Sequence, residues 1–119
     1  ANAQDIKAKY IFEVANGPIS SDADEILATR ETYIFPDILV NAGGVTVSYF
    51  EWVQNRSGWY WTLEEVNQRL QAKMTEEAER VWKISQEQTL SLRTAAYVLA
   101  LTRLGEALDA KGNRNYFVN

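Results

Sequence analysis

The stretch from Asn41 to Ser48, Asn-Ala-Gly-Gly-Val-Thr-Val-Ser, has the residue types and the spacing of a ligand-binding site. Asn41 is a good N-cap, because its side-chain oxygen can accept a hydrogen bond from the free N–H groups that open a helix. Gly43 and Gly44 predict a tight turn, and because they carry no Cβ a bulky ligand can come close to the backbone. The unpaired N–H groups and the positive end of the helix suit a carboxylate, a phosphate or an amide oxygen.

Val45, Ser48 and Trp52 share one face of the helix that follows, at positions i, i+3 and i+7. A single hydroxyl between two apolar neighbours, one turn inside the helix, indicates the lining of a pocket. The alternative is a buried serine that bonds its own helix backbone. The pattern leaves both interpretations open.

Asn16 is a second candidate, because it follows a predicted strand. Residues 8–14 are rich in aromatic and β-branched residues, and Ala-Asn-Gly-Pro at 15–18 then ends the strand. Asn16 therefore lies just beyond the carboxyl end of a strand, where ligands bind in open α/β sheets. The alternative is a turn asparagine with no ligand.

A βαβ unit would bring the two asparagines together. A capping box at residues 21–24 predicts a short helix, and residues 32–35 predict a second strand that continues irregularly through 36–40. The two strands should be parallel and the crossover right-handed. Asn16 and Asn41 then face the same edge of the sheet, and their amides share one crevice with the helix mouth.

Helices fill the rest of the chain. After a turn at residues 55–58, the aromatic residues 59–61 indicate a packing or interface role. Thr62 and Glu65 form a capping box, and the helix that they open measures roughly 35–40 Å if it is unbroken to about Gln86.

The last helix is capped by Ser91 and is apolar nearly all round at residues 95–101. Such a helix must be covered on most sides, so a partner domain or subunit is expected. Gly112 is the expected end of this helix, and residues 113–119 form a tail.

Composition excludes several classes of function. The chain has 119 residues, 46% of them hydrophobic, which suits one globular domain. A net charge of −4 argues against nucleic acid, and the lack of histidine and cysteine argues against a metal site. There is no apolar run of roughly 20 residues to span a membrane, and a cytoplasmic protein is expected.

In several segments and in their order, the chain resembles the C-terminal part of glutamate dehydrogenases, within the Glu/Leu/Phe/Val dehydrogenase family. The resemblance covers nearly all of the 119 residues. The segments that carry it are Ala8-Lys9-Tyr10, Ala15-Asn16-Gly17-Pro18, Pro36-Asp37-Ile38-Leu39, Asn41-Ala42-Gly43-Gly44-Val45, Ser48-Tyr49-Phe50-Glu51-Trp52, Tyr60-Trp61-Thr62 and Arg93-Thr94-Ala95-Ala96.

The resemblance implies a helix-rich α/β fold in a single C-terminal fragment of a dinucleotide-binding domain. Residues 1–58 would supply the βαβ unit and the glycine-turn helix, as the second half of a Rossmann-like NAD(P)-binding domain. Residues 59–112 would supply the long C-terminal helices. Family members are commonly homo-hexamers, and a fragment with an open strand edge is expected to self-associate.

The resemblance also implies an activity, the NAD(P)-dependent oxidative deamination of L-glutamate to 2-oxoglutarate and ammonia. Residues like Asn16 and Asn41 lie beside the nicotinamide in that family. Residues like Val45 and Ser48 belong to the substrate pocket, and the serine contacts the distal carboxylate. The stretch Ser-Tyr-Phe-Glu-Trp at 48–52 favours the glutamate branch over the leucine, valine and phenylalanine branches.

The chain departs from the family pattern in what it lacks. No Gly-x-Gly-x-x-Gly occurs, so the half that would hold the pyrophosphate and choose between NAD and NADP is missing. The family's substrate-binding and catalytic lysines and its proton-handling aspartate have no counterpart either, so we expect no catalytic residue here and no turnover by the chain alone. The alternative is a non-catalytic binding or assembly module that kept the fold.

Overall fold

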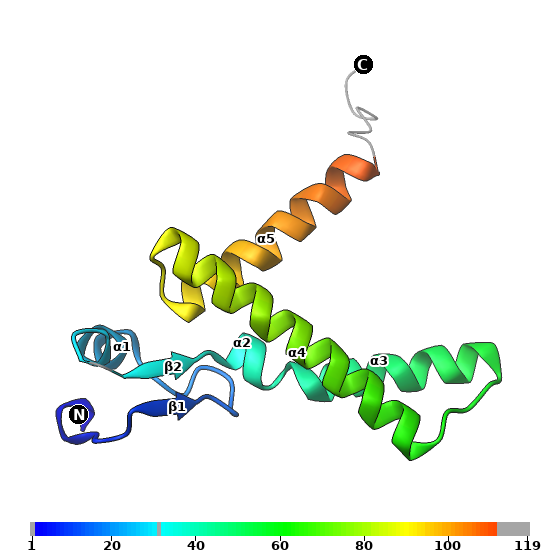
Figure 1. The fold of residues 1–119 in the computed structure, drawn as a ribbon, viewed down its shortest axis with the longest axis horizontal. Coiled ribbons are helices and arrows are strands. Elements are labelled where there is room, and N and C mark those ends of the chain that lie inside the picture. Colours follow the sequence, from blue (N-terminus) through cyan, green and yellow to red (C-terminus); the bar gives the residue numbers. More distant parts are fainter. Residues whose placement is uncertain (1, 31, 112–119) are drawn as a thin grey trace.

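The computed structural model describes residues 2–30 and 32–111, and Figure 1 shows their arrangement. A pair of short strands lies at the N-terminal end, and long helices make up the rest. In chain order the elements are η1 (Ala3–Asp5), β1 (Tyr10–Phe12), α1 (Ser21–Ala28), β2 (Tyr33–Phe35), α2 (Asp37–Val40), α3 (Ala42–Ser57), α4 (Leu63–Gln88) and α5 (Leu92–Ala110).

The two strands are parallel, with α1 between them in the chain, which confirms the predicted βαβ order. Tyr10 pairs with Tyr33 and Phe12 with Phe35. The strands are shorter than the predicted residues 8–14 and 32–35. Both of these aromatic pairs stack their rings, with Phe12 and Phe35 only 4.6 Å apart between ring centres.

The prediction that the second strand continues through residues 36–40 is wrong, because these residues form the helical turn α2. Pro36 sits at its N-cap with φ −72°, a value that its ring fixes and that suits a helix start. Asp37 then accepts a hydrogen bond from Ile38 N at 2.7 Å on Oδ1. The side chain of Asp37 thereby satisfies one of the N–H groups that open the turn.

The predicted tight glycine turn is also absent. Gly43 and Gly44 lie inside the first turn of α3, and neither has a positive φ. Only Asn41 separates α2 from α3, so the chain passes almost directly from one helix to the next. The helix α3 runs on to Ser57 and ends at Gly58, which is left-handed with φ 69° and replaces the longer turn expected at residues 55–58.

Two of the four predicted helix caps are confirmed in detail. Thr62 and Glu65 form the capping box of α4, and Ser91 accepts from Thr94 N at the start of α5. The capping box predicted at residues 21–24 is wrong. The helix α1 begins one residue earlier than predicted, with Ser20 at the N-cap and without a side-chain cap, so Asp24 lies one position beyond the N3 position that a capping box requires.

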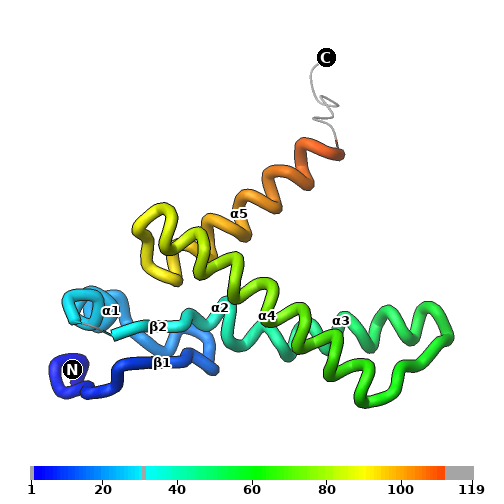
Figure 2. The backbone as a smooth tube through the Cα atoms, viewed as in Figure 1, coloured from blue at the N-terminus to red at the C-terminus, as the bar shows by residue number. Residues whose placement is uncertain are grey.

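The helix α4 is the longest element, with 26 residues and a length of about 39 Å at 1.5 Å per residue. It forms a hairpin with α3 at one end, and α5 leaves its other end at an angle (Figure 2). The expected stop at Gly112 and the tail at 113–119 lie outside the described residues.

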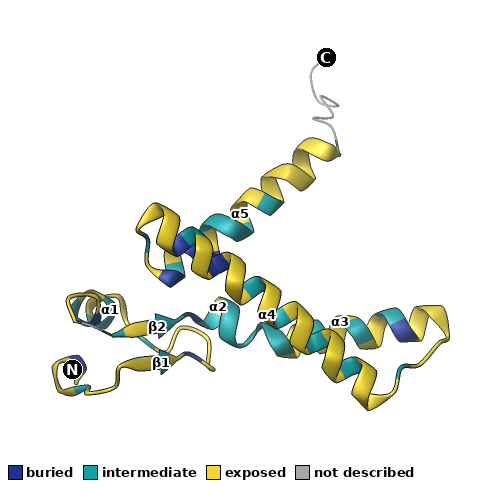
Figure 3. Ribbon diagram, viewed as in Figure 1, coloured by how far each residue is buried: buried dark blue, intermediate teal, exposed yellow. Residues whose placement is uncertain are grey.

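The hydrophobic core is small and lies where the end of α4 meets the start of α5 (Figure 3). Its buried members are Val81, Leu92, Ala95 and Ala96. The outer half of α5 carries no such cover. Its exposed apolar side chains, 50–68% accessible, are Tyr97, Leu101, Leu104 and Leu108.

The aromatic residues 59–61 differ in their exposure to solvent. Trp59 and Tyr60 are exposed, whereas Trp61 meets the edge of Phe50 with 5.6 Å between ring centres. The guanidinium of Arg69 lies 4.1 Å from the ring centre of Trp61, a cation–π geometry. Among the described residues, no helix combines the length and the apolar character that crossing a membrane requires.

Candidate functional site

The side-chain amides of Asn16 and Asn41 are in direct contact. Asn41 Nδ2 donates a hydrogen bond to Asn16 Oδ1 at 2.5 Å, across 25 positions of sequence. Asn16 follows β1, and Asn41 follows α2, the helical turn that continues β2. The sequence-based prediction that the two amides meet at one edge of the sheet is confirmed.

The predicted role of Asn41 as a side-chain cap is wrong. Asn41 does occupy the position before α3, but its side chain makes no capping bond. Its backbone, with φ −91° and ψ 0°, lacks the extended conformation usual at an N-cap. The amide instead reaches across to Asn16, away from the start of its own helix.

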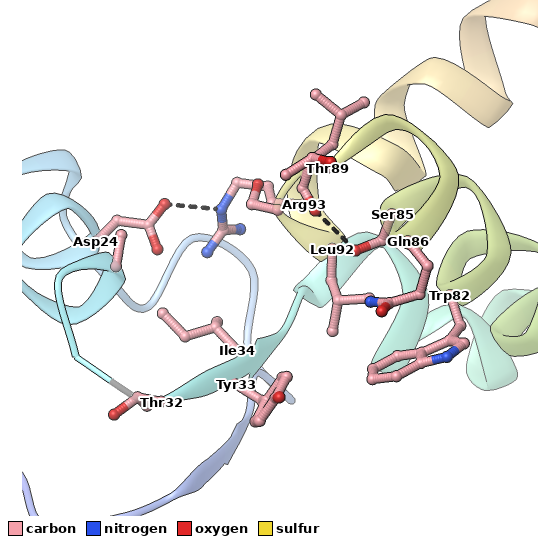
Figure 4. A pocket seen from close by; sticks show the side chains of 13 residues that line it. Asp24, Thr32, Tyr33, Ile34, Trp82, Ser85, Gln86, Thr89, Leu92 and Arg93 are labelled. Carbon is pink, nitrogen blue, oxygen red and sulfur yellow. Dashed lines mark hydrogen bonds and ion pairs between the residues drawn. The ribbon is translucent and has the colours of Figure 1, made fainter.

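An ion-pair cluster lies close to the edge of the sheet that carries Asn16 and Asn41. Arg93 of α5 forms a two-armed pair with Glu13, Nη1 to Oε2 and Nη2 to Oε1, both at 2.9 Å. Its Nε donates to Asp24 Oδ2 at 3.2 Å, the contact drawn in Figure 4. The side chain of Glu13 is only 1% exposed, and the positive charge of Arg93 offsets the cost of burying this carboxylate. The hydrogen bonds that Arg93 donates to Glu13 raise the pKa of Arg93, which stays charged.

Asp37 joins the cluster to the asparagine edge. Its Oδ2 accepts from Gly17 N at 2.8 Å, and its own N–H donates to Glu13 Oε2 at 2.9 Å. Arg93 Nη1 lies 3.6 Å from its Oδ1. The hydrogen bond from Gly17 is the largest cause that lowers the pKa of Asp37, followed by that from Ile38.

Sequence reasoning missed this cluster. The available signal was Glu13, a carboxylate inside an apolar strand, which requires a buried partner. The partner lies 80 positions away in α5, and the other two carboxylates come from separate helices. No local spacing marks such a set.

The first two turns of α3 divide into a packed side and an open side. A Cβ on Gly43 would lie 3.8 Å from Leu70 Cδ1 and 4.0 Å from Met74 Sδ, so this glycine faces α4. A Cβ on Gly44 would meet no described atom within 4 Å. Val45 is 70% exposed on the same helix end. The open side therefore offers space beside the backbone.

Ser48 is exposed and donates to its own helix, from Oγ to Gly44 O at 3.2 Å. This is the backbone bond of the alternative interpretation, but the serine is not buried as that alternative required. The bond leaves the hydroxyl oxygen as an acceptor. Both the binding interpretation and a purely local one fit this geometry.

A cavity of about 570 Å³ lies elsewhere, between β2, α4 and the start of α5 (Figure 4). Tyr33 and Trp82 supply its aromatic wall, and neither Asn16 nor Asn41 lines it. Ser85 at its rim already donates to Leu90 O at 2.7 Å. Within residues 2–30 and 32–111, no group of three potential ligands is placed to hold a metal ion.

The comparisons with known proteins agree with each other. The sequence model of the Glutamate/Leucine/Phenylalanine/Valine dehydrogenase family matches residues 1–112. An NADP-specific glutamate dehydrogenase of Synechocystis sp. is 66% identical over 116 residues, which cover 98% of this chain and 27% of the relative. An NAD-specific glutamate dehydrogenase of Clostridioides difficile is 49% identical over 110 residues, which cover 92% of this chain and 26% of the relative.

Solved structures give the same result. The glutamate dehydrogenase of Peptoniphilus asaccharolyticus superimposes with a TM-score of 0.88 at 40% identity, over 93% of this chain and 28% of that one. A hetero-hexameric glutamate dehydrogenase of Thermus thermophilus, in a leucine-bound form, also gives 0.88, at 34% identity over 92% of this chain and 26% of that one.

The fold confirms a helix-rich α/β structure with two parallel strands that matches part of a glutamate dehydrogenase. The chain spans about a quarter of the length of the curated relatives that it matches. With the family model covering residues 1–112, the chain belongs to the Glutamate/Leucine/Phenylalanine/Valine dehydrogenase family.

Proposed function

We propose that this chain forms the nicotinamide side and part of the substrate pocket of an enzyme that deaminates L-glutamate to 2-oxoglutarate and ammonia with NAD or NADP. In this proposal it is the C-terminal part of a longer subunit and the second half of a Rossmann-like domain. The names of the relatives support the substrate, and include both an NADP-specific and an NAD-specific enzyme. The observation that carries the proposal is the contact of Asn16 with Asn41.

The paired amides have hydrogen-bonding groups to spare. Their mutual bond uses one N–H of Asn41 and the oxygen of Asn16, which leaves the NH2 group of Asn16 and the oxygen of Asn41. A donor beside an acceptor complements a primary amide, such as the carboxamide of nicotinamide. The nicotinamide ring supplies the hydride chemistry when bound, and the two asparagines orient the ring.

The open end of α3 suits the substrate. Val45 offers an exposed apolar surface, and the hydroxyl of Ser48 lies one turn further along. Donation to a substrate carboxylate would replace the 3.2 Å bond to Gly44 O by a charge-assisted bond, which is roughly twice as strong. Gly44 leaves room for the ligand beside the helix backbone.

A chimeric enzyme tests the proposal. This chain replaces the segment of the Synechocystis enzyme that it matches over 116 residues. We expect the chimera to reduce a nicotinamide dinucleotide when glutamate is added, and the chain alone to show no such reaction, since it lacks a phosphate-binding Gly-x-Gly-x-x-Gly. The intact Synechocystis enzyme is the control. A folded chimera without turnover would favour a non-catalytic binding or assembly role.

A further inference from the structure

We propose that Asp37 is a positioning residue that sets the distance between the amides of Asn16 and Asn41. Its kinetic consequence rests on the proposed function, whereas its structural consequence does not. Asp37 touches neither a substrate nor a cofactor in this proposal. It acts through the Gly17 turn, next to Asn16, and through the backbone of α2, which leads to Asn41.

Asp37 holds the Gly17 turn with its side chain and Asn41 with its backbone. Its Oδ2 accepts from Gly17 N at 2.8 Å, and Gly17 directly follows Asn16. Its carbonyl oxygen accepts from Asn41 N at 3.0 Å. One residue therefore links the neighbour of the first asparagine to the second asparagine itself.

The turn at Gly17 needs this anchor. Gly17 has a left-handed φ of 56°, a conformation that glycine adopts without steric cost. Because glycine also adopts other conformations easily, its backbone preference alone does not fix the turn. Its N–H bond to Asp37 is the contact that ties the turn to α2. Without that bond, the Gly17 turn would lose its anchor on α2, and Asn16 could move away from Asn41.

The carboxylate of Asp37 is itself fixed in orientation. Oδ1 accepts from Ile38 N at 2.7 Å and lies 3.6 Å from Arg93 Nη1. The N–H of Asp37 donates to Glu13 Oε2 at 2.9 Å, and Arg93 holds Glu13 in turn. Rotation of the side chain would remove the acceptor from two backbone N–H groups at once, which is costly.

The substitution Asp37→Asn tests this role without changing the size of the side chain. Asparagine has the same shape but only one side-chain oxygen. We expect that oxygen to keep the Oδ1 position, beside Ile38 N and the cation of Arg93, so that Gly17 N faces an NH2 group instead of an acceptor. We expect the Gly17 turn to move and the Asn41 Nδ2–Asn16 Oδ1 distance to exceed about 3.5 Å, beyond a hydrogen bond. The matched control is Asp22→Asn, the same change at an exposed aspartate in α1.

Crystal structures of the chimera and of its two variants measure that distance directly. This readout does not depend on activity, so it decides the positioning role even if the chimera proves inactive. If Asp37→Asn does not fold, Asp37→Glu serves instead, because it keeps the charge opposite Arg93 and displaces the carboxylate by one methylene. An unchanged amide contact in the folded variant overturns the proposal.

Kinetic measurements distinguish a positioning role of Asp37 from a purely structural one. In an active chimera, we expect Asp37→Asn to lower kcat/KM by about 10- to 100-fold, the usual effect of a displacement near 1 Å. In the background of Asn41→Leu, which removes the amide partner of Asn16, the same change should cost less than about twofold. Equal losses in both backgrounds would mean that Asp37 does not act through the asparagines.

Discussion

Arg93 in α5 and Glu13 at the end of β1 form a two-armed ion pair, with both bonds at 2.9 Å, across 80 positions of sequence. This pair connects the sheet to the last helix. Because the carboxylate is almost fully buried, its removal from water must be compensated by Arg93 and by Asp37 N.

The substitution Arg93→Met should therefore be severely destabilising. It leaves the carboxylate of Glu13 buried without its cation, at a cost of about 3–5 kcal/mol. The control is Arg80→Met, which removes an exposed pair with Glu76 on α4 and should cost about 0.2–1 kcal/mol. Urea unfolding of the chain compares the two variants, and similar losses would refute the central role of the Glu13–Arg93 pair.

Local signals in the sequence predicted local structure well. The hydroxyls of Thr62 and Ser91 act on residues three positions away, so their caps were readable from spacing alone. The meeting of Asn16 and Asn41 was also predictable, since parallel strands end at the same edge of a sheet. The capping box expected at residues 21–24 fails because α1 begins one residue earlier, which moves Asp24 out of the N3 position.

Two further sequence-based predictions, for Asp37 and Gly43, are wrong because the residues make contacts with distant parts of the chain. The sequence predicts that Asp37 continues a strand, although its carboxylate accepts two backbone N–H groups, one of them 20 positions away. The sequence also predicts a turn at Gly43, although this residue lies inside α3 and faces Leu70 and Met74 of α4. Both depend on contacts across the fold that no local pattern carries.

The lowered pKa of Asp37 predicts a specific dependence of stability on pH. A carboxyl with a pKa below its ordinary 3.8 in the folded state stabilises the fold when ionised. Its contribution is therefore present above the ordinary value and is lost as the pH falls through the lowered pKa. The difference in unfolding free energy between the unaltered chain and Asp37→Asn should be constant from pH 7 to 5 and shrink below about pH 3.8. A difference that grows on acidification would contradict this sign.

The uncovered face of α5 predicts self-association of the chain. Tyr97, Leu101, Leu104 and Leu108 are exposed and recur at intervals of four, three and four residues, the spacing of a helix-pairing seam. We expect dimers or larger species in sedimentation, and a shift to monomer in Leu104→Glu. Thr102→Glu, at an exposed position between the seam residues, is the control and should not dissociate them. A monomer at high concentration would refute the prediction.

The substitution Asn41→Asp tests the amide pair as a nicotinamide site. The aspartate loses the donor to Asn16, and if Asn16 turns its amide to compensate, the pair presents only oxygens to the ligand. We expect the chimera to bind a nicotinamide dinucleotide about tenfold more weakly, as for the loss of one hydrogen bond. ADP-ribose lacks the nicotinamide, so its Kd should not change. An equal loss for both ligands would place the effect outside the nicotinamide contact.

The substitution Ser48→Ala distinguishes a substrate-binding hydroxyl from one that only bonds its helix. A hydrogen bond to the distal carboxylate of glutamate contributes about 1.5–3 kcal/mol, which corresponds to roughly 10- to 150-fold in kcat/KM. We expect a loss of that size for glutamate in the chimera, and no loss for norvaline, which has no carboxylate at that position.

The matched control for Ser48→Ala is Ser57→Ala at the other end of α3. Ser57 Oγ donates to Gln54 O at 3.2 Å, the same length as the bond from Ser48 to Gly44 O, and it also accepts from Trp59 N at 3.3 Å. Ser57→Ala therefore loses at least as many backbone bonds as Ser48→Ala. Only the change at Ser48 should discriminate between the two substrates. If Ser48→Ala keeps normal thermal stability and affects glutamate and norvaline alike, the hydroxyl serves its own helix and Ser48 does not belong to the substrate site.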